Sequence, residues 1–491
     1  MGPHSGAAVG MSLRIAFDNS FARLPDRLFA PQSPTPVPNP DLIALNAPLA
    51  RSLGLDPAEL ASADGLAMLS GNTLPAGAQP LAQAYAGHQF GGFVPQLGDG
   101  RAILLGEVID DHGTRQDIQL KGAGRTPFSR GGDGRAWLGP VMREYLVSEA
   151  MHVLGVPTTR ALAAVTTGAT ILRDTGPVPG AILTRVAPSH IRVGTFQYFA
   201  VRQDTAALEA LLAYSCTRHF PTAHDAFSLL QATITAQAHL IAQWMGLGFI
   251  HGVMNTDNAH IGGLTIDYGP CAFMDGYNPN QVFSSIDHMG RYAYANQPQI
   301  AVWNMAQFAT ALLPLMGPRD AAIERATEIV HTFPTLYETA WAAKFRAKLG
   351  LIGEDAGDIA LIDDFLALMA TENADFTRSF RGLANGTTWA EFKDPAGFEI
   401  WNARWQARLA STPTPPNTPP LEQRLATANP AYIPRNHQIA AAITAGLSGD
   451  FAPFHRIAAV WARPYETQPG AEDLALSPAP NQVVHATFCG T

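Results

Sequence analysis

The chain has 491 residues, and its composition of 47% apolar and 15% charged residues supplies a sizeable core and excludes a disordered protein. Its formal net charge of −9 excludes a surface that attracts nucleic acid as a whole, so any bound anion needs a local basic patch. The length predicts two or three domains, or one large two-lobed domain.

The first 190 residues are predicted to form a mixed sheet with one long helix. Residues 1–80 are rich in proline and alanine and contain one predicted helix, at residues 40–55. Apolar runs bounded by glycine and turn residues predict strands at residues 101–109, 115–121, 160–168, 169–174 and 180–187. The helical periodicity of residues 138–155 ends at a Gly-Val-Pro sequence, which is a typical helix stop.

The remaining residues are predicted to be mostly helical. Amphipathic periodicity predicts helices at residues 205–220, 223–248, 298–315, 319–350, 358–376 and 435–449. Residues 411–420, STPTPPNTPP, can form neither a helix nor a central strand and are predicted to be a stiff, extended connector. The sequence thus predicts an α+β fold with a strand-rich N-terminal lobe and a larger helical C-terminal lobe. We expect an N-terminal extension at residues 1–80, an N-lobe at 81–190, a C-lobe at 191–350 and a C-terminal helical region at 351–491.

Cysteine usage and apolar patterning predict a cytoplasmic protein. The three cysteines, Cys216, Cys271 and Cys489, are odd in number and far apart, which argues against a secreted disulfide framework and a Cys-x-x-Cys metal site. The N-terminal sequence lacks a basic region followed by a long apolar run, so no signal peptide is expected. The longest apolar window, residues 300–317, is interrupted by polar residues and a proline, so no membrane-spanning helix is expected.

The stretch HGVMNTDNAHIGGLTIDYGP, residues 251–270, carries a constellation of oxygen ligands. Asp257, Asn258 and Asp267 are hard ligands, suited to a Mg²⁺ or Mn²⁺ ion that bridges phosphates. Counted from His251, Asn258 has the spacing of the metal-binding asparagine in a kinase catalytic loop, and Asp-Tyr-Gly stands where Asp-Phe-Gly would. We expect residues 259–266 to form a small hairpin that brings Asn258 and Asp267 close together.

The position of the usual catalytic base does not fit an ordinary kinase. Val253 occupies it, and a valine cannot accept a proton from a hydroxyl group. The acid available instead is Asp257, next to Asn258. The alternative for this short motif is a turn or a helix cap, since Asn and Asp satisfy local backbone groups well.

Residues that suit phosphate binding lie upstream in the chain. Lys121 ends the strand at residues 115–121, and a glycine-rich segment precedes these strands without matching a standard phosphate loop. Arg125, Arg130 and Arg135 follow at five-residue spacing among glycines, which indicates a local anion cradle, with a solvated surface loop as the alternative. Arg185 and Arg192 lie where the two lobes would join.

The helix at residues 138–155 offers two acids that could hold Lys121. Glu149 shares a face with apolar residues of the helix, so the helical pattern favours it as the inward acid, and Glu144 lies nearly opposite. A helix packed on two sides can bury both faces, so the pattern leaves both residues open.

The chain resembles the selenoprotein O family, whose bacterial members are kinase-fold protein adenylyltransferases. The resemblance lies in YAGHQFGGFVPQLGDGRAILLGE, QLKGAGRTPFSRGGDGRA, REYLVSEAMHVLGVPTTRAL, HGVMNTDN and TIDYGP, in that order over about residues 80–280. It implies a protein-kinase-like two-lobed fold that binds ATP in a flipped orientation. It also implies transfer of AMP to Ser, Thr or Tyr hydroxyls of protein substrates.

The resemblance implies roles for individual residues, matched motif by motif. The nucleotide would be bound by Gly98, Gly100, Arg101, Lys121, Asp133, Gly134, Arg185, Arg192 and Asp267. Asn258 and Asp267 would hold Mg²⁺ or Mn²⁺, and Asp257 would be the catalytic base. The family also implies Glu144, rather than Glu149, as the partner of Lys121.

The same resemblance suggests a redox device at the C-terminus. Family members often carry selenocysteine or cysteine two residues before the end, and Cys489 stands there. A regulatory disulfide between Cys489 and Cys271 is one hypothesis; the alternative is a buried apolar Cys271 and a free thiol at 489.

The expected partners are protein substrates bearing hydroxyl groups, with no nucleic acid, no membrane and a monomeric state favoured. Three alternative functions stay open: UMP transfer from UTP with Mn²⁺, phosphate transfer by a small-molecule or protein kinase, and a catalytically inactive nucleotide-binding pseudokinase scaffold. Val253 argues against the kinase, and an intact Lys121, Asn258 and Asp267 argue against the scaffold.

Overall fold

The computed structural model describes residues 14–174 and 176–488, which form two compact units. Unit 1 comprises the described residues within Met1–Ala84, Gly98–Trp137 and Ala161–Ser189. Unit 2 comprises those within Tyr85–Leu97, Leu138–Arg160 and His190–Thr491. The α+β class predicted from the sequence is confirmed, because one unit is built on a sheet and the other is mainly helical.

Unit 1 is built on an eight-stranded sheet with antiparallel pairing along its central strands. Its order is β1 (Phe29–Pro31), β3 (Leu81–Gln83), β6 (Ala102–Ile109), β7 (Arg115–Lys121), β10 (Gly176–Ala187), β9 (Arg160–Arg173) and β2 (Asp41–Leu45), with β8 (Ala136–Trp137) also paired to β10. The register sets Lys121 opposite both Ala102 on β6 and Leu183 on β10. Side chains such as Ile103, Leu105 and Ile118 form its buried core.

The helix predicted at residues 40–55 is only half correct. Residues 41–45 form strand β2, which pairs with β9, and the helix α1 (Ala47–Ser52) begins after it. Asn46 caps α1, because its side chain accepts the backbone N–H of Leu49 at 3.1 Å. Pairing with a distant strand therefore overrides the local helical pattern. Two more short helices, α2 (Pro57–Leu60) and α3 (Ala63–Leu69), and the 3-10 turns η1 (Phe21–Arg23) and η2 (Asp26–Leu28) complete unit 1.

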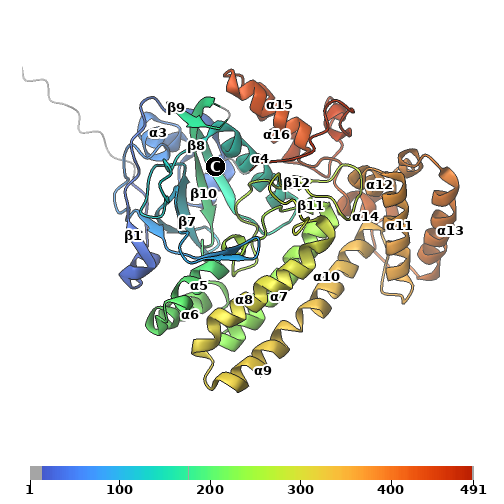
Figure 1. Cartoon of the computed structure of the whole chain (residues 1–491). Helices are drawn as coiled ribbons and strands as arrows, with labels where there is room; N and C mark the ends of the chain where they lie inside the picture. Colours follow the sequence, from blue (N-terminus) through green and yellow to red (C-terminus); the bar gives the residue numbers. More distant parts are fainter. Residues whose placement is uncertain (1–13, 175, 489–491) are drawn as a thin grey trace, which may run out of the picture. The chain divides into compact units, whose positions relative to one another are not determined.

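Unit 2 is mainly helical. Its helices are α4 (Leu138–Val153), α5 (Val193–Val201), α6 (Thr205–His219), α7 (Ala226–Leu247), α8 (Gln297–Leu312), α9 (Arg319–Val330), α10 (Phe333–Lys348), α11 (Asp358–Glu372), α12 (Phe376–Gly382), α13 (Pro395–Ser411), α14 (Leu421–Ala428), α15 (Asn436–Leu447) and α16 (Ala452–Trp461). Helices α7, α8 and α10 run side by side, and α4 packs against α15 and α16 (Figure 1). Two small sheets, β4 (Gly87–Gln89) with β5 (Gly92–Val94) and β11 (Phe249–Ile250) with β12 (Ala272–Phe273), complete the unit.

Most of the predicted helices are present, with two breaks. The helix predicted at residues 319–350 is divided into α9 and α10, because Pro334 stands in the first turn of α10 and starts a new helix. The helix predicted at residues 358–376 ends at Asn373, whose φ of 52° is left-handed and stops α11. Of the connector predicted at residues 411–420, residues 412–420 form neither helix nor strand, whereas Ser411 is the last residue of α13.

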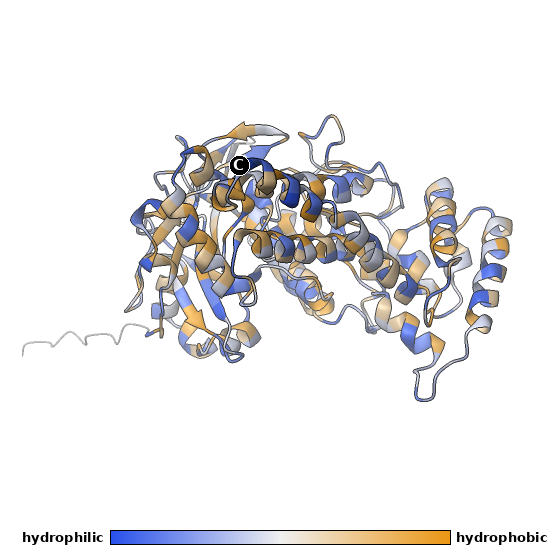
Figure 2. Cartoon of the chain, turned by 90° about the horizontal axis from the view of Figure 1, so that it is seen from below, coloured by the Kyte–Doolittle hydropathy of each residue, from blue (hydrophilic) through white to orange (hydrophobic). Residues whose placement is uncertain are grey.

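Polar residues interrupt the apolar ones along the helices, as the colouring of Figure 2 shows. Of the helices in residues 14–174 and 176–488, none has the length and the apolar composition that a membrane crossing requires.

A buried ion cluster joins distant parts of unit 2. Arg435, whose side chain is 1% exposed, contacts Asp275 at 2.5 Å and Asp375 at 2.8 Å. Ser477 donates to the same Asp375. Asp275 follows β12, Asp375 caps α12 and Arg435 precedes α15, so one guanidinium neutralises carboxylates from two separate segments.

Replacing the guanidinium should destabilise unit 2. We expect Arg435→Leu to lower the free energy of unfolding by about 3–5 kcal/mol, because two carboxylates would stay buried without their counter-charge. Urea denaturation of the full chain measures this change. Arg456→Leu is the matched control: Arg456 also pairs with an aspartate, Asp473, but both side chains are about half exposed, so the expected loss is about 0–1 kcal/mol. Equal losses in the two variants would contradict the prediction.

Candidate active site

The imidazole of His251 joins the two ends of the predicted ligand stretch. Helix α7 ends at the left-handed Gly248, β11 follows, and His251 is the next residue. Its Nε2 lies 2.9 Å from the carbonyl of Ile266, and its Nδ1 accepts the backbone N–H of Val253 at 3.4 Å. Burial lowers the pKa of His251, which favours the neutral ring that this pair of contacts requires. His251 is therefore a fully satisfied structural residue.

Asn258 is fixed by the loop that it ends. It closes the 3-10 turn η3 (Thr256–Asn258), and its Nδ2 donates to the carbonyl of Val253 at 2.9 Å. The amide N–H is thus bonded to the loop backbone, and within the described residues the Oδ1 of Asn258 has no hydrogen-bond partner. An oxygen in this state is suited to a metal ion.

The hairpin expected at residues 259–266 does not form. Its two arms pair elsewhere: His260 bridges to Arg192, and Thr265 bridges to Thr158. Gln237 from α7 binds the carbonyl of His260 at 2.6 Å. Backbone groups of other segments thus replace the cross-strand pairing that the glycine pair was expected to support.

Asp267 lies against the buried guanidinium of Arg192. Its Oδ2 is 3.1 Å from Arg192 Nη2, and its φ of 62° is a left-handed conformation that a non-glycine residue rarely adopts. Arg192 also covers the ring of Tyr85, with the guanidinium carbon 4.3 Å from the ring centre. The next residue, Tyr268, is buried and its hydroxyl contacts that of Thr158. Two predicted site residues, Asp267 and Arg192, are therefore in direct contact.

Asp257 is a buried carboxyl group with one unpaired oxygen. It is 8% exposed, its Oδ2 accepts Nε2 of Gln89 at 3.1 Å, and its buried Oδ1 has no hydrogen-bond partner among the described residues. Burial raises the pKa of Asp257 to about 6; the charge of Asp267 acts in the same direction, while Gln89 and Arg192 oppose it. The unpaired oxygen leaves Asp257 able to accept a proton.

The hairpin of β4 and β5 packs against this loop, a contact that no sequence pattern predicts. The backbone N–H of His88 donates to Thr256 Oγ1 at 2.7 Å, next to the contact between Gln89 and Asp257. A Cβ atom at Gly87 would lie 2.5 Å from Asp257 Oδ1, so the close approach requires glycine. The first half of the glycine-rich segment, which the sequence predicts to suit phosphate binding, belongs to unit 2 and packs on residues 255–257. The phosphate contact itself stays a prediction.

Further polar side chains hold the hairpin and the loop together. Asn255 Oδ1 accepts the N–H of Phe90 at 3.2 Å and the hydroxyl of Tyr292 at 2.6 Å. Gln197 on α5 accepts the hydroxyl of Thr256 at 2.6 Å and lies 2.9 Å from Nδ1 of His88. The motifs quoted for the family resemblance contain Asn255, Thr256 and His88, but they do not indicate which residues contact one another. Gln197 and Tyr292 lie outside those motifs.

In unit 1 the second half of the glycine-rich segment packs on the loop after β7. Gly98 has a left-handed φ of 71°, and a Cβ there would lie 2.3 Å from the ring of Phe128. Gly100 accepts the hydroxyl of Ser129 at its carbonyl, and the carbonyl of Arg101 accepts the N–H of Gly122 at 2.7 Å. The predicted residues Gly98, Gly100 and Arg101 thus lie beside the loop that follows Lys121, a half-buried residue.

A buried polar chain fixes Arg185. Its Nε and Nη2 donate to Oε1 of Gln119 at 3.1 and 2.6 Å. Gln119 in turn donates to Asp99 Oδ2 at 3.2 Å, and that oxygen also accepts the N–H of Gln83 at 3.0 Å. Gln119 lies inside β7, whose sequence is typical of a strand, so no pattern predicts its contact with the guanidinium.

An ion pair holds the loop after Lys121 against β9. Asp133 binds Arg173 at 2.8 Å and 3.1 Å and accepts the N–H of Arg135 at 2.9 Å. Burial acts to raise the pKa of Asp133, but the bonds to Arg173 outweigh it and the net pKa is lowered. The carbonyl of Gly134 accepts the N–H of Gly124 at 3.0 Å, which closes the loop.

The anion cradle predicted from three arginines is only partly available. Arg135 donates to the carbonyls of Thr35 and Pro36, and Arg125 donates to the carbonyl of Gly131. Arg130 is exposed in a left-handed conformation with φ of 49°. Arg135 therefore braces the loop, while Arg125 and Arg130 face solvent.

The two glutamates of α4 have different environments. Glu149 binds Arg160 through both oxygens, at 2.9 and 2.8 Å. Glu144 is 3% exposed. Both oxygens of Glu149 are thus bound by Arg160, and the pairing of either glutamate with Lys121 stays a prediction.

Cys271 is buried, and its carbonyl accepts Nη1 of Arg143 at 3.4 Å. Cys489 lies outside the described residues, so the disulfide between them stays a prediction.

The donor set fits a divalent metal that shares its coordination with a nucleotide. Within the described residues, no group of three or more His, Cys, Asp or Glu side chains could hold a metal ion. Asn258 Oδ1 and Asp267 are oxygen donors, and Mg²⁺ is commonly held by one or two such groups together with phosphates and water. The residues present therefore suit a metal that arrives with its nucleotide.

Comparisons with known proteins agree with this chemistry. The family model described as Protein adenylyltransferase SelO matches residues 11–461. A protein of Ruegeria pomeroyi named Protein nucleotidyltransferase YdiU is 56% identical over 481 residues, which cover 98% of this chain and 100% of the relative. A protein of Bradyrhizobium diazoefficiens with the same name is 55% identical over 494 residues, with 98% and 100% covered.

The chain is an enzyme of the nucleotidyltransferase class. It belongs to the SelO family, as the motifs in its sequence predicted.

The contact between the hairpin and Asp257 predicts that alanine substitution of two hairpin glycines affects activity differently. We expect Gly87→Ala to reduce nucleotidyl transfer by about 100-fold, because the added Cβ displaces the carboxyl group. Gly92→Ala on the paired strand should keep near-normal activity, because its Cβ meets no described atom closer than 3.5 Å. Turnover of both variants, together with thermal unfolding to establish that each is folded, checks this. Equal activity in the two variants would refute the close packing at Gly87.

Proposed function

We propose that the enzyme transfers AMP from ATP to Ser, Thr or Tyr hydroxyl groups of proteins and releases pyrophosphate. The observation that carries this proposal is the environment of Asp257: a buried carboxyl group with an unpaired oxygen, one residue from Asn258 and within electrostatic range of Arg192 and Asp267. The family description, a protein adenylyltransferase, supports the same reaction.

The proposed reaction is a displacement at the α-phosphorus of ATP. The acceptor hydroxyl gives its proton to Asp257, its oxygen forms the new bond to the α-phosphorus, and the bond between that phosphorus and the β-phosphate oxygen breaks. Pyrophosphate leaves with the bonding pair and the developing negative charge. Val253 has no acceptor atom in its side chain, which supports Asp257 as the base of this loop.

The charged residues have complementary roles in this proposal. Lys121, Arg185 and Arg192 would neutralise the phosphates, and Glu144 would orient Lys121. Gly98, Gly100, Arg101, Asp133 and Gly134 would complete the nucleotide contacts. Asn258 and Asp267 would hold Mg²⁺ or Mn²⁺, which when bound supplies a Lewis acid for the phosphate charge. The spacing of His251, Asn258 and Asp267 also supports a protein-kinase-like two-lobed fold as part of the proposal.

The transferred group is tested with ATP labelled at the α-phosphate and, in parallel, at the γ-phosphate, with Mg²⁺ or Mn²⁺. We expect label to reach protein from the α position alone and to be absent with a chelator or with Asp267→Ala. Label from γ alone would show a kinase instead. Greater labelling from UTP than from ATP would show uridylyl transfer, a reaction that the name of the relatives leaves open. Binding of ATP without transfer would favour a scaffold.

The role of Asp257 is tested by its amide. We expect Asp257→Asn to lower the transfer rate by about 10²- to 10⁴-fold, because the amide cannot accept the hydroxyl proton. ATP affinity should change little, since this side chain is not proposed to contact the nucleotide. Rate and equilibrium binding are measured on the same preparation, and an unchanged rate would remove Asp257 from the reaction.

The chain from Asp99 through Gln119 to Arg185 predicts a selective loss of phosphate binding. We expect Gln119→Leu to weaken ATP binding about tenfold or more, because the guanidinium loses a charge-assisted hydrogen bond. Adenosine, which lacks phosphates, should bind as before. Gln116→Leu on the same strand is the control, since Gln116 binds Asp110 and not Arg185. Calorimetric titration measures all four combinations, and a parallel loss for adenosine would contradict the assignment.

A further inference from the structure

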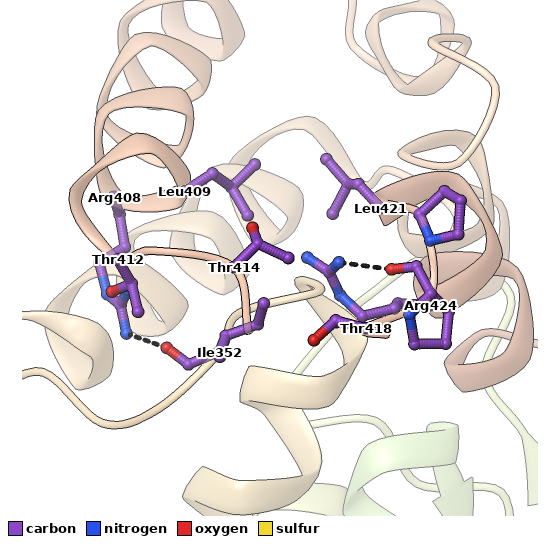
Figure 3. Close-up of a pocket in the computed structure, with 10 residues that line it drawn as sticks. Ile352, Arg408, Leu409, Thr412, Thr414, Thr418, Leu421 and Arg424 are labelled. Atoms are coloured by element: carbon purple, nitrogen blue, oxygen red, sulfur yellow. Dashed lines mark hydrogen bonds between the residues drawn. The ribbon is translucent and has the colours of Figure 1, made fainter. Parts of the chain in front are cut away.

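Unit 2 contains a pocket made of residues that the proposed reaction does not use. It has a volume of about 320 Å³, at the lower end of the range of about 300–1,000 Å³ for small-molecule sites. Its lining comes from the end of α13, the proline-rich connector and the start of α14, with Ile352 from the segment after α10. Figure 3 shows the guanidinium of Arg424 in the middle of this pocket, facing Thr414 and Thr418.

Among the residues that the structure describes, no carboxylate pairs with the cation of Arg424. Its Nη1 donates to the carbonyl of Pro419 and its Nη2 to the carbonyl of Gly350, each at 2.8 Å. Its Nε is buried and has no hydrogen-bond partner among the described residues. Carbonyl oxygens orient the guanidinium but leave its charge uncompensated, so the pocket holds a fixed positive charge in a protein of net charge −9.

The second arginine of the pocket adds to this excess of positive charge. Arg408 shares the buried Asp358 with Arg346, so one carboxylate faces two guanidinium groups. Arg346 reaches a second acid, Glu354, which is 78% exposed and therefore screened by water. Glu422, in the first turn of α14, does not line the pocket.

Hydroxyl groups and apolar walls complete the lining. Thr412 accepts Nη1 of Arg408 at 2.7 Å, whereas the hydroxyls of Thr414 and Thr418 make no hydrogen bond within the described part of the chain. On the side of the pocket away from Thr418, Leu409 and Leu421 face each other in Figure 3. The pocket thus combines a guanidinium and two unused hydroxyls with an apolar surface.

We propose that this pocket binds a phosphate monoester with a small apolar body. The planar guanidinium suits two phosphate oxygens, and the threonine hydroxyls suit the third, which a carboxylate does not have. Leu409 and Leu421 would cover the apolar body. The inference is independent of the proposed adenylyl transfer, because none of the pocket residues belongs to that site.

The test is calorimetric titration of the full chain with phenyl phosphate, carried out with a saturating non-hydrolysable ATP analogue and Mg²⁺ to block the nucleotide site. We expect binding of one phenyl phosphate per chain, with phenylacetate at least about tenfold weaker and neutral benzyl alcohol without measurable binding. Phenyl phosphate is titrated to about 10 mM, so that a dissociation constant as weak as about 10 mM is still detected. Absence of phenyl phosphate binding in this range, or equal binding of phenylacetate, would overturn the proposal.

Variants locate the bound phosphate. Arg424→Leu should weaken phenyl phosphate binding by about tenfold or more, whereas Arg404→Leu should not, because Arg404 lies on α13 outside the pocket and pairs with Asp364. Since Arg424 also holds two carbonyls, the double variant Thr414→Val, Thr418→Val provides a second test that leaves both arginines in place. We expect a loss of about tenfold there as well. Unchanged affinity in the double variant, or equal losses for Arg424→Leu and Arg404→Leu, would overturn the proposal.

Discussion

The site of unit 2 depends on one neutral imidazole ring. His251 accepts the N–H of Val253 on one side and contacts the carbonyl of Ile266 on the other, so it fixes the start of the loop that carries Asp257 and Asn258 and the residue before Asp267. A charged ring would need a second acceptor in place of the Val253 N–H. Burial disfavours that charged form, and the stacking of Trp244 on the ring, 5.3 Å between centres, keeps water away. The geometry of three polar residues therefore follows from a histidine that takes no part in the chemistry.

Around this ring, the charged groups balance one another in a small volume. Asp267 is matched by Arg192, whose other face is covered by Tyr85, while Asp257 is held by the neutral Gln89. A neutral donor orients a carboxyl group without compensating its charge, so Asp257 keeps a raised pKa and Asp267 keeps its cationic partner. Two carboxyl groups in one loop system thereby acquire different properties, as the proposed roles of acid–base group and metal ligand would require.

Much of the secondary structure and part of the candidate site could be predicted from the sequence. The features that could not be predicted depend on contacts between distant residues. The strands of unit 1 and the long helices of unit 2 follow from periodicity, and the spacing of His251, Asn258 and Asp267 indicated the candidate ligand stretch. Residues 41–45 were assigned to a helix because pairing with β9 involves residues more than 100 positions away. Gln89 and Gln119 escaped notice because a glutamine carries no signal of the carboxylate or guanidinium that it contacts. Lys121 and the arginines were predicted from the sequence pattern to suit phosphates, whereas the individual roles proposed in nucleotide binding come from the family resemblance.

The discontinuous make-up of the two units has a consequence for how the protein is synthesised. The polypeptide passes from one unit to the other at residues 84, 97, 137, 160 and 189, so neither unit corresponds to a single stretch of the chain. Strand β2 emerges from the ribosome long before its partner β9, and at about 5–20 residues per second it waits on the order of ten seconds for that partner. During this interval the nascent sheet has an unpaired edge with apolar residues such as Ile43 exposed. Chaperone binding to the nascent chain should therefore concentrate on the period before Ala187, the end of the last strand of the sheet, has emerged from the ribosome.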